Sequence, residues 1–320
     1  MKTIKNYFDG IKPILILFIL IMLACLQSCK SDKKQMNDNQ IEPKKDNSIV
    51  VITQAMDFQT LDTISSGWNT FKWSNNSLEV HLFLLDKYPT GKYVSDATKL
   101  AADFQKGMDL INVGKPDEAN VEFGKLPEWF GEIVFSGGSG LLSPEETSIT
   151  TLYLEPGYYV MECYVKMANG VFHTVMGMAK GIVVTDGNSG NSALQASVNI
   201  VLSSENGITY DNIVKSGEQV ISVTFKDQIV HENFLGHDIN LVKLDENANL
   251  EELESWMNWA TPTGLRSPSP KGITFLGGVN DSPAGSVGYF KVTLTPGNYA
   301  FISEVPNASN KKMLKTFTVQ

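Results

Sequence analysis

Short apolar runs, separated by Gly and Pro, recur along most of the chain after residue 48. The runs at 49–52 (IVVI), 78–85 (LEVHLFLL) and 182–184 (IVV) are rich in β-branched and other apolar residues. They are too short for ordinary helices, and the Gly and Pro residues between them mark turns. This pattern predicts an all-β fold.

Two stretches of the chain match each other at a constant separation of 140 residues. The sequence FSGG at 135–138 corresponds to FLGG at 275–278, and PGYY at 156–159 corresponds to PGNY at 296–299. A largely β-strand repeat of this length indicates two copies of one β-sandwich. The Gly pairs within the repeat are interpreted as tight turns. The expected organisation is a first domain at 49–185, a linker at 186–197 and a second domain at 198–320.

Each copy also contains a short pattern with helical spacing. In the first copy, apolar residues follow Ser95, a candidate N-cap, and Asp96 lies in the predicted first turn. These apolar residues are Leu100, Ala101, Phe104, Met108 and Ile111. The second copy has a comparable pattern at 249–259. Met108, Trp256 and Trp259 are expected to pack these helices against the sandwiches.

The first 30 residues look like a targeting segment. Three lysines precede the unbroken apolar run ILILFILIMLA at 14–24, which is too short for a membrane-spanning helix but has the length of a signal-peptide core. Leu26-Gln27-Ser28-Cys29 follows and resembles the lipobox of bacterial lipoproteins. The resemblance implies a signal peptide at 1–28, lipidation of Cys29 and a flexible tether at 29–48. An uncleaved membrane anchor is the alternative. We therefore expect a lipid-anchored protein of the bacterial cell envelope, at the outer membrane and facing either the periplasm or the exterior.

Composition and charge exclude several classes of function. The 320 residues include 26 Lys and Arg against 35 Asp and Glu, a formal net charge of −9. Without clustered basic residues, this balance disfavours nucleic acid as a partner. Four histidines are too few for a multinuclear metal centre built on many imidazoles. No phosphate-binding loop, HExxH pair or GxSxG motif occurs, so we expect no catalytic residues and no enzymatic activity.

One cysteine remains once Cys25 is removed and Cys29 is lipidated. Cys163 follows a predicted strand in which Tyr159, Met161 and Cys163 share one face. His173 follows after nine intervening residues, and Met176 and Met178 come next. A lone thiol outside the cytoplasm needs to be buried or bound to a ligand.

This spacing resembles the cupredoxin family, in which Cys, His and Met on one loop and a second His from an earlier strand hold copper. The resemblance implies two tandem Greek-key cupredoxin-like β-sandwiches, each with a short helical insertion. Its implied ligands for a single copper in the first domain are His81, Cys163, His173 and Met178, with Met176 as an alternative to Met178. Thiolate, two imidazoles and a weak thioether suit both copper oxidation states.

The second copy lacks this ligand set. Ser303 stands at the position of Cys163, and only His237 and Met313 match ligand positions. Two functions remain open. One is a membrane-anchored copper protein for electron transfer or copper handling, whose partner is a redox protein or a copper donor. The other is a metal-free cupredoxin-like binding or structural module of the cell envelope, in which Cys163 is a core residue and exposed tryptophans bind a partner or a glycan.

Overall fold

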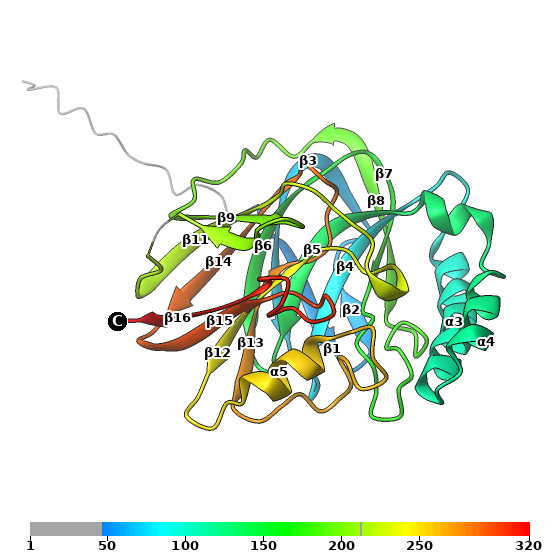
Figure 1. Ribbon diagram of the computed structural model, residues 1–320. Helices are drawn as coiled ribbons and strands as arrows, with labels where there is room; N and C mark the ends of the chain where they lie inside the picture. Colours follow the sequence, from blue (N-terminus) through cyan, green and yellow to red (C-terminus); the bar gives the residue numbers. More distant parts are fainter. Residues whose placement is uncertain (1–46, 212) are drawn as a thin grey trace, which may run out of the picture. The chain divides into compact units, whose positions relative to one another are not determined.

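The described part of the chain consists of two successive series of strands (Figure 1). The computed structural model describes residues 47–320 except Asn212 and the side chain of Asn233. The predicted signal peptide, Cys29 and most of the predicted tether lie outside the described residues. The first series contains β1 (Ile49–Gln54), β2 (Asp57–Gln59), β3 (Thr63–Asn75), β4 (His81–Tyr88), β5 (Val134–Leu142), β6 (Thr147–Leu154), β7 (Gly157–Glu162) and β8 (Ala179–Asn188). The second contains β9 (Val198–Ser203), β10 (Gly207–Tyr210), β11 (Gly217–Phe225), β12 (Ile239–Leu244), β13 (Ile273–Val279), β14 (Val287–Leu294), β15 (Gly297–Ile302) and β16 (Leu314–Val319).

Most strand pairings of the first series recur in the second, although that of β3 with β8 has no equivalent between β11 and β16 in the described residues. Strand β1 runs parallel to β3 and antiparallel to β2, as β9 does with β11 and β10. Strand β7 lies between β4 and β8, as β15 lies between β12 and β16. The predicted all-β fold of two tandem Greek-key β-sandwiches, each with a helical insertion, is confirmed. The predicted domain boundaries stay predictions, although β8 continues to Asn188, inside the segment expected to be linker.

Strand β3 serves both sheets of the first sandwich. Its first part pairs with β8, and from Gly67 onward it pairs with β6. Gly67 has φ = +94°, a left-handed conformation that costs glycine little and other residues more. The strand therefore changes direction at Gly67 and closes one edge of the sandwich.

The two sandwiches share continuous sheets. Strand β6 pairs with β14, and β5 pairs with β13, in both cases antiparallel. Thr150 pairs with Phe290, its own counterpart in the repeat, so an approximate two-fold axis passes through this seam. Residues Asn47–Gln320 accordingly form one compact unit.

The Gly pairs of the repeat do not form the tight turns predicted for them. Gly137 and Gly138 lie inside β5, and Gly277 and Gly278 lie inside β13. Gly137 and Gly277 have φ of +86° and +88°, and the pairing of β4 with β5 shifts register nearby. The glycines allow the backbones to bulge and to approach each other closely.

The helices lie outside the sandwiches, and α3 (Val94–Asn112) and α4 (Pro116–Phe123) stand together beside the first one (Figure 1). Helix α3 begins one residue after Tyr93, so the prediction of Ser95 as N-cap is wrong. The Asp96 carboxylate instead accepts a hydrogen bond from the backbone N–H of Tyr93, at 3.0 Å. Helix α4 and the 3-10 helix η1 (Glu128–Glu132) were not predicted.

The second helical insertion matches its prediction more closely. Helix α5 (Leu250–Met257) begins at Asn249, whose side chain accepts backbone hydrogen bonds from Glu251 and Glu252. Met108, Trp256 and Trp259 are all buried, as expected of residues that pack the insertions onto the body. A short 3-10 helix, η2 (Glu232–Phe234), precedes β12.

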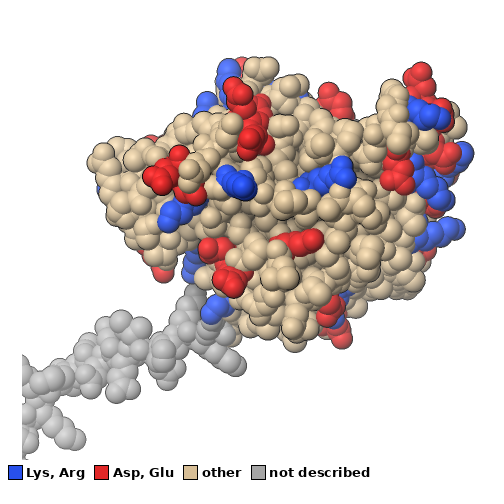
Figure 2. Space-filling view, turned by 90° about the horizontal axis from the view of Figure 1, so that it is seen from below, with Lys and Arg blue, Asp and Glu red and all other residues tan. Residues whose placement is uncertain are grey.

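The surface carries both acidic and basic side chains. In the face shown in Figure 2 they are interspersed and no broad basic area is visible. None of the five tryptophans is exposed, since Trp73, Trp256 and Trp259 are buried and Trp68 and Trp129 are half-buried. The exposed tryptophan platform expected of a binding module is therefore not present. No helix in the described residues is long and apolar enough to cross a membrane.

Candidate metal centre

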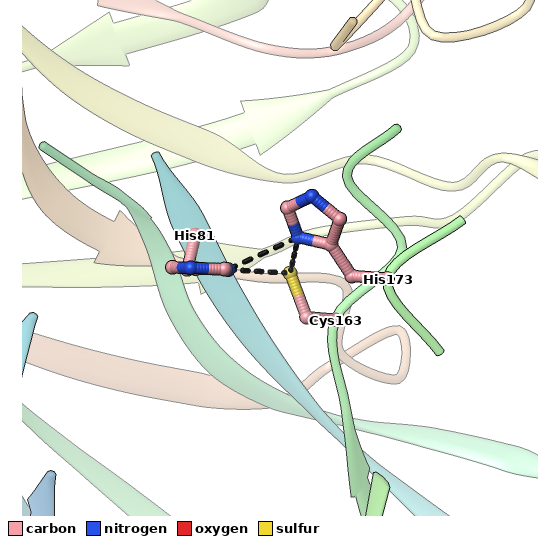
Figure 3. Close-up of side chains that lie close together, drawn as sticks. All are labelled: His81, Cys163 and His173. Carbon is pink, nitrogen blue, oxygen red and sulfur yellow. Dashed lines mark hydrogen bonds between the residues drawn. The ribbon is translucent and has the colours of Figure 1, made fainter. Parts of the chain in front are cut away.

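Three of the predicted ligands meet at one end of the first sandwich. His81 is the first residue of β4, and Cys163 directly follows β7. Strands β4 and β7 are antiparallel neighbours, with Leu84 opposite Glu162, so both side chains leave the sheet at the same end. His173 comes from the loop that leads to β8, and its ring faces the other two side chains (Figure 3).

The donor atoms of these residues form a small triangle. The Cys163 Sγ lies 3.6 Å from His81 Nδ1 and 3.5 Å from His173 Nδ1, and the two Nδ1 atoms are 3.0 Å apart. Metal–nitrogen bonds of about 2.0 Å and metal–sulfur bonds of about 2.3 Å place donors about 3.3–3.7 Å apart around one ion. The triangle fits a single ion bound through one sulfur and two nitrogens with little rearrangement. It is the one group of three or more His, Cys, Asp or Glu donors within 4.8 Å of one another in the described residues.

Backbone hydrogen bonds hold the loop in this arrangement. The N–H of Thr174 and its hydroxyl both donate to the Cys163 carbonyl, at 2.9 and 2.8 Å. The Met178 N–H donates to the His173 carbonyl at 3.0 Å, and the Cys163 N–H donates to the Met178 carbonyl at 3.3 Å. The fold therefore positions the donors before any ion binds, which is the preorganisation that a rigid site requires.

Burial decides the protonation of the three groups. It lowers the pKa of His81 to about 3, with repulsion from His173 as a second cause, and lowers the pKa of His173 to about 4. Both imidazoles are therefore neutral near pH 7, the form that binds metals. Burial also raises the pKa of Cys163 to about 12, so the metal-free side chain is a thiol. A metal ion would have to displace that proton.

A carboxylate contacts the outer edge of the centre. The Nε2 of His173 lies 3.1 Å from a carboxylate oxygen of Glu79, whose side chain is 31% exposed. A carboxylate hydrogen-bonded to this nitrogen would fix the orientation of a ligating imidazole and strengthen it as a donor. The contact with Glu79 does not have hydrogen-bond geometry, since Nε2 has no hydrogen-bond partner among the described residues. Sequence reasoning did not identify Glu79; its place two residues before His81 was the available signal.

The two candidate methionines differ in burial. Met178 is fully buried, and its backbone is bonded to both Cys163 and His173. Met176 is 55% exposed. Burial therefore favours Met178 over Met176 as the fourth ligand, which stays a prediction.

The corresponding region of the second sandwich is filled by polar residues that bind one another. Ser303 occupies the position of Cys163, and its N–H donates to the Met313 carbonyl just as that of Cys163 does to Met178. The Ser303 hydroxyl donates to the Asp238 carboxylate at 2.6 Å. His237 Nδ1 lies 3.3 Å from the Asp227 carbonyl oxygen. The second sandwich therefore has His237 and Met313 at ligand positions but neither the thiolate nor the second imidazole that copper would need.

The second sandwich also covers the ligand loop of the first. Trp259 stacks on Phe172, with ring centroids 5.7 Å apart, and its indole N–H donates to the Tyr164 carbonyl. The buried ammonium of Lys166 donates to the carbonyls of Trp259 and Thr261, at 2.9 Å each. Burial lowers the pKa of Lys166 to about 7. These contacts exclude solvent from the loop, and the pattern of a single cupredoxin domain could not have indicated them.

Glu304, next to Ser303, is fully buried, and neither carboxyl oxygen has a hydrogen-bond partner among the described residues. Burial, followed by repulsion from Asp238, raises the pKa of Glu304 well above its usual value. The folded protein therefore keeps a proton that the unfolded chain loses above about pH 4.5. This group lowers the free energy of unfolding as pH rises, by up to about 1.4 kcal/mol per pH unit.

We expect that Glu304→Gln, which cannot ionise, does not lose free energy of unfolding in this way as pH rises. Its stability relative to the natural protein should be greater at pH 7 than at pH 5, as measured by urea unfolding. Glu251→Gln on the exposed side of α5 is the matched control and should show no such trend. A difference between Glu304→Gln and the natural protein that is the same at both pH values would contradict the expectation.

Proteins similar to this chain occur among solved structures. No family model matches the chain, and no curated protein matches it. Solved structures similar to it include a Na-dithionite reduced auracyanin from the photosynthetic bacterium Roseiflexus castenholzii, 20% identical, with 42% of this chain and 94% of that chain covered and a TM-score of 0.26. Auracyanin A, a blue copper protein from Chloroflexus aurantiacus, is 21% identical, with coverage of 43% and 98% and a TM-score of 0.25. A Cu-containing nitrite reductase from Thermus scotoductus is 11% identical over 85% of this chain and 61% of that chain, with a TM-score of 0.21. The assignment of the fold rests on the strand pairing described above.

Proposed function

We propose that the first sandwich binds one copper ion through His81, Cys163 and His173, with Met178 as a weak fourth ligand. The observation that carries the proposal is the buried triangle of one sulfur and two Nδ1 atoms. A soft thiolate with two imidazoles suits copper, which would supply a one-electron redox couple there. The neutral imidazoles and the hydrogen-bonded loop are ready to bind without refolding.

Burial of the ligands favours electron transfer over copper delivery. All three donor residues have no exposed surface, whereas a protein that passes its metal to a partner must let the partner's ligands reach it. Electrons do not need such access. The His173 Nε2 lies 3.1 Å from the carboxylate of Glu79, a partly exposed side chain, and we propose this contact as a path between the centre and a docked redox protein.

The proposed location completes this role. Lipidation of Cys29 would hold the protein at a membrane of the cell envelope, and the polar segment at 29–48 would let the folded body reach membrane-bound or soluble partners. The acidic net charge favours a partner with a basic docking surface.

Copper titration tests the proposal directly. We would use the full chain with Cys25→Ser and Cys29→Ser, so that Cys163 is the sole thiol, and measure metal content and the absorption spectrum. We expect one tightly bound copper per chain and an intense thiolate-to-copper absorption band. Copper content near zero without that band would overturn the proposal and favour the metal-free envelope module.

The repeat offers a matched pair of variants for the same titration. His81→Ala should lose the band, because it removes one corner of the donor triangle. His237→Ala, at the corresponding position of the second sandwich, should retain one copper and an unchanged spectrum. Equal losses in both variants would place the copper elsewhere.

A further inference from the structure

A cavity of about 120 Å³ lies between the two sandwiches, beneath α3. Its first wall consists of residues from β4, α3 and β7, and its second wall comes from segments around β12 and β13 of the other sandwich. Glu162 and Thr174 line it, whereas their neighbours Cys163 and His173 face the metal centre. The cavity is thus separated from the metal centre by one layer of backbone and is a distinct site.

Half of the polar residues that line this cavity carry carboxyls. Asp86 and Glu162 come from the first sandwich, and Asp238 and Asp281 come from the second. No Lys, Arg or His is among the lining residues. Burial is the largest cause that raises the pKa of Asp86 and of Asp281 well above their usual values. The cavity therefore concentrates acidic groups whose raised pKa values keep them protonated in the free protein, and a bound cation would favour their ionised form.

One oxygen of a lining carboxyl and one lining amide nitrogen lack a partner in the described part of the chain, although the Asp86 carboxyl is hydrogen-bonded to that of Glu162. Asp86 is 2% exposed, and its Oδ1 has no hydrogen-bond partner among the described residues. Asn280 is 1% exposed, and its Nδ2 likewise has none, although its Oδ1 accepts from the Tyr164 hydroxyl at 2.9 Å. An unpaired buried acceptor is costly, so Asp86 is a group that a bound donor would satisfy.

The rest of the cavity wall is aromatic and aliphatic. The rings of Phe104, Phe172 and Trp259 contact one another, with centroid separations of 5.7–6.1 Å. The Lys166 ammonium already lies over the Trp259 and Phe172 rings, 5.2 and 5.9 Å from their centroids. The wall therefore suits the apolar body of a ligand rather than its charged group.

The spacing of the carboxyls disfavours a metal ion as the occupant. Apart from the metal centre, no three His, Cys, Asp or Glu donors in the described residues come within 4.8 Å of one another. Metal ions need several donors around one point, whereas an organic cation can reach one carboxyl with its charged group and the aromatic wall with its body.

Phe234 lies at the rim of the cavity. It is 40% exposed and has φ = +70°, an unfavourable conformation for a bulky residue. Its ring packs edge-on against Phe123 and Phe130, at 5.8 and 5.3 Å. A strained residue at a cavity mouth can move aside to admit a ligand.

We infer that this cavity binds a small organic cation, with its ammonium group against Asp86 and its apolar body against Phe172 and Trp259. A cavity of about 150 Å³ accommodates benzene, so this cavity of about 120 Å³ encloses no more than about one ring, and a ligand that also carries an ammonium group extends through its mouth. Asn280 Nδ2 is placed to donate to an oxygen of such a ligand.

Calorimetric titration of the full chain with benzylammonium, benzyl alcohol and benzoate tests the inference without copper. We expect one benzylammonium per chain, at least tenfold weaker binding of benzyl alcohol and no binding of benzoate. Asp86→Asn should weaken benzylammonium binding by about tenfold or more, whereas Asp57→Asn on exposed β2 should leave it unchanged.

A second variant separates charge from space. Leu100→Trp adds bulk to the α3 wall without changing a carboxyl, and it should also abolish binding while the circular dichroism spectrum is retained. Equal affinity for benzyl alcohol and benzylammonium, or no effect of Asp86→Asn, would overturn the inference. So would absence of benzylammonium binding at millimolar concentration, which would mean that the cavity holds water only.

Discussion

Replacement of Cys163 by serine should eliminate the thiolate-to-copper absorption band and weaken copper binding by at least about 100-fold. The reason is chemical, because the hydroxyl of serine is a hard, weakly acidic donor and leaves only two imidazoles in the described triangle. The measurement is a Cu(II) titration followed by absorption and metal analysis, in the background in which Cys25 and Cys29 are also serine.

The repeat indicates that Cys163→Ser will fold. Ser303 occupies the same position in the second sandwich, with the same backbone bond to the following methionine. Ser303→Ala is the matched control and should leave the copper spectrum unchanged. If Cys163→Ser retained the band, the thiolate could not come from Cys163 and the proposed centre would be wrong.

Gly138→Ala adds a single methyl group and should nevertheless lower the free energy of unfolding by about 3 kcal/mol or more. A Cβ at this position would overlap the carbonyl oxygen of Phe83 and approach the Cα of Leu84 to 2.9 Å. Both contacts are with the backbone of β4, which begins at His81, so the clash cannot be relieved by a side-chain rotation. Urea unfolding of the metal-free protein would measure the loss.

Gly131→Ala provides the control for this substitution. Gly131 lies in η1, and a Cβ there would meet no heavy atom within 4 Å beyond its neighbours along the chain. We expect a change within about 0.5 kcal/mol, as for most surface substitutions. Similar losses in the two variants would show that backbone entropy, not close packing of β5 on β4, dominates at Gly138.

The second sandwich contributes to both sites of the first, because it covers the ligand loop of the metal centre and forms one wall of the cavity. Lys166 and Trp259 form part of this contact, and neither is a ligand. The contact covers Phe172, the neighbour of His173 in the ligand loop. The lack of a second donor set is thus compatible with a structural role for the second sandwich.

The errors in sequence interpretation have specific physical causes. Ser95 is a good N-cap residue, but the first turn of α3 begins earlier because Asp96 can reach the backbone N–H of Tyr93. The Gly pairs were interpreted as turns because left-handed glycine is common there; in β5 and β13 the same freedom instead permits strand bulges. Both errors arise because a local signal is compatible with more than one environment.

The sequence by itself determined the strands, the two-fold repeat and the candidate ligands, since periodicity, Gly-Pro punctuation and the order of Cys, His and Met are local properties of the chain. Only the tertiary structure decided that His81 meets Cys163 from 82 residues away, that Glu79 contacts His173, and that four carboxyls face one cavity between the sandwiches. These contacts depend on the pairing of strands that are distant in sequence and on the sheets that join the two sandwiches. Such contacts between distant segments are set by packing, which no short stretch of sequence encodes.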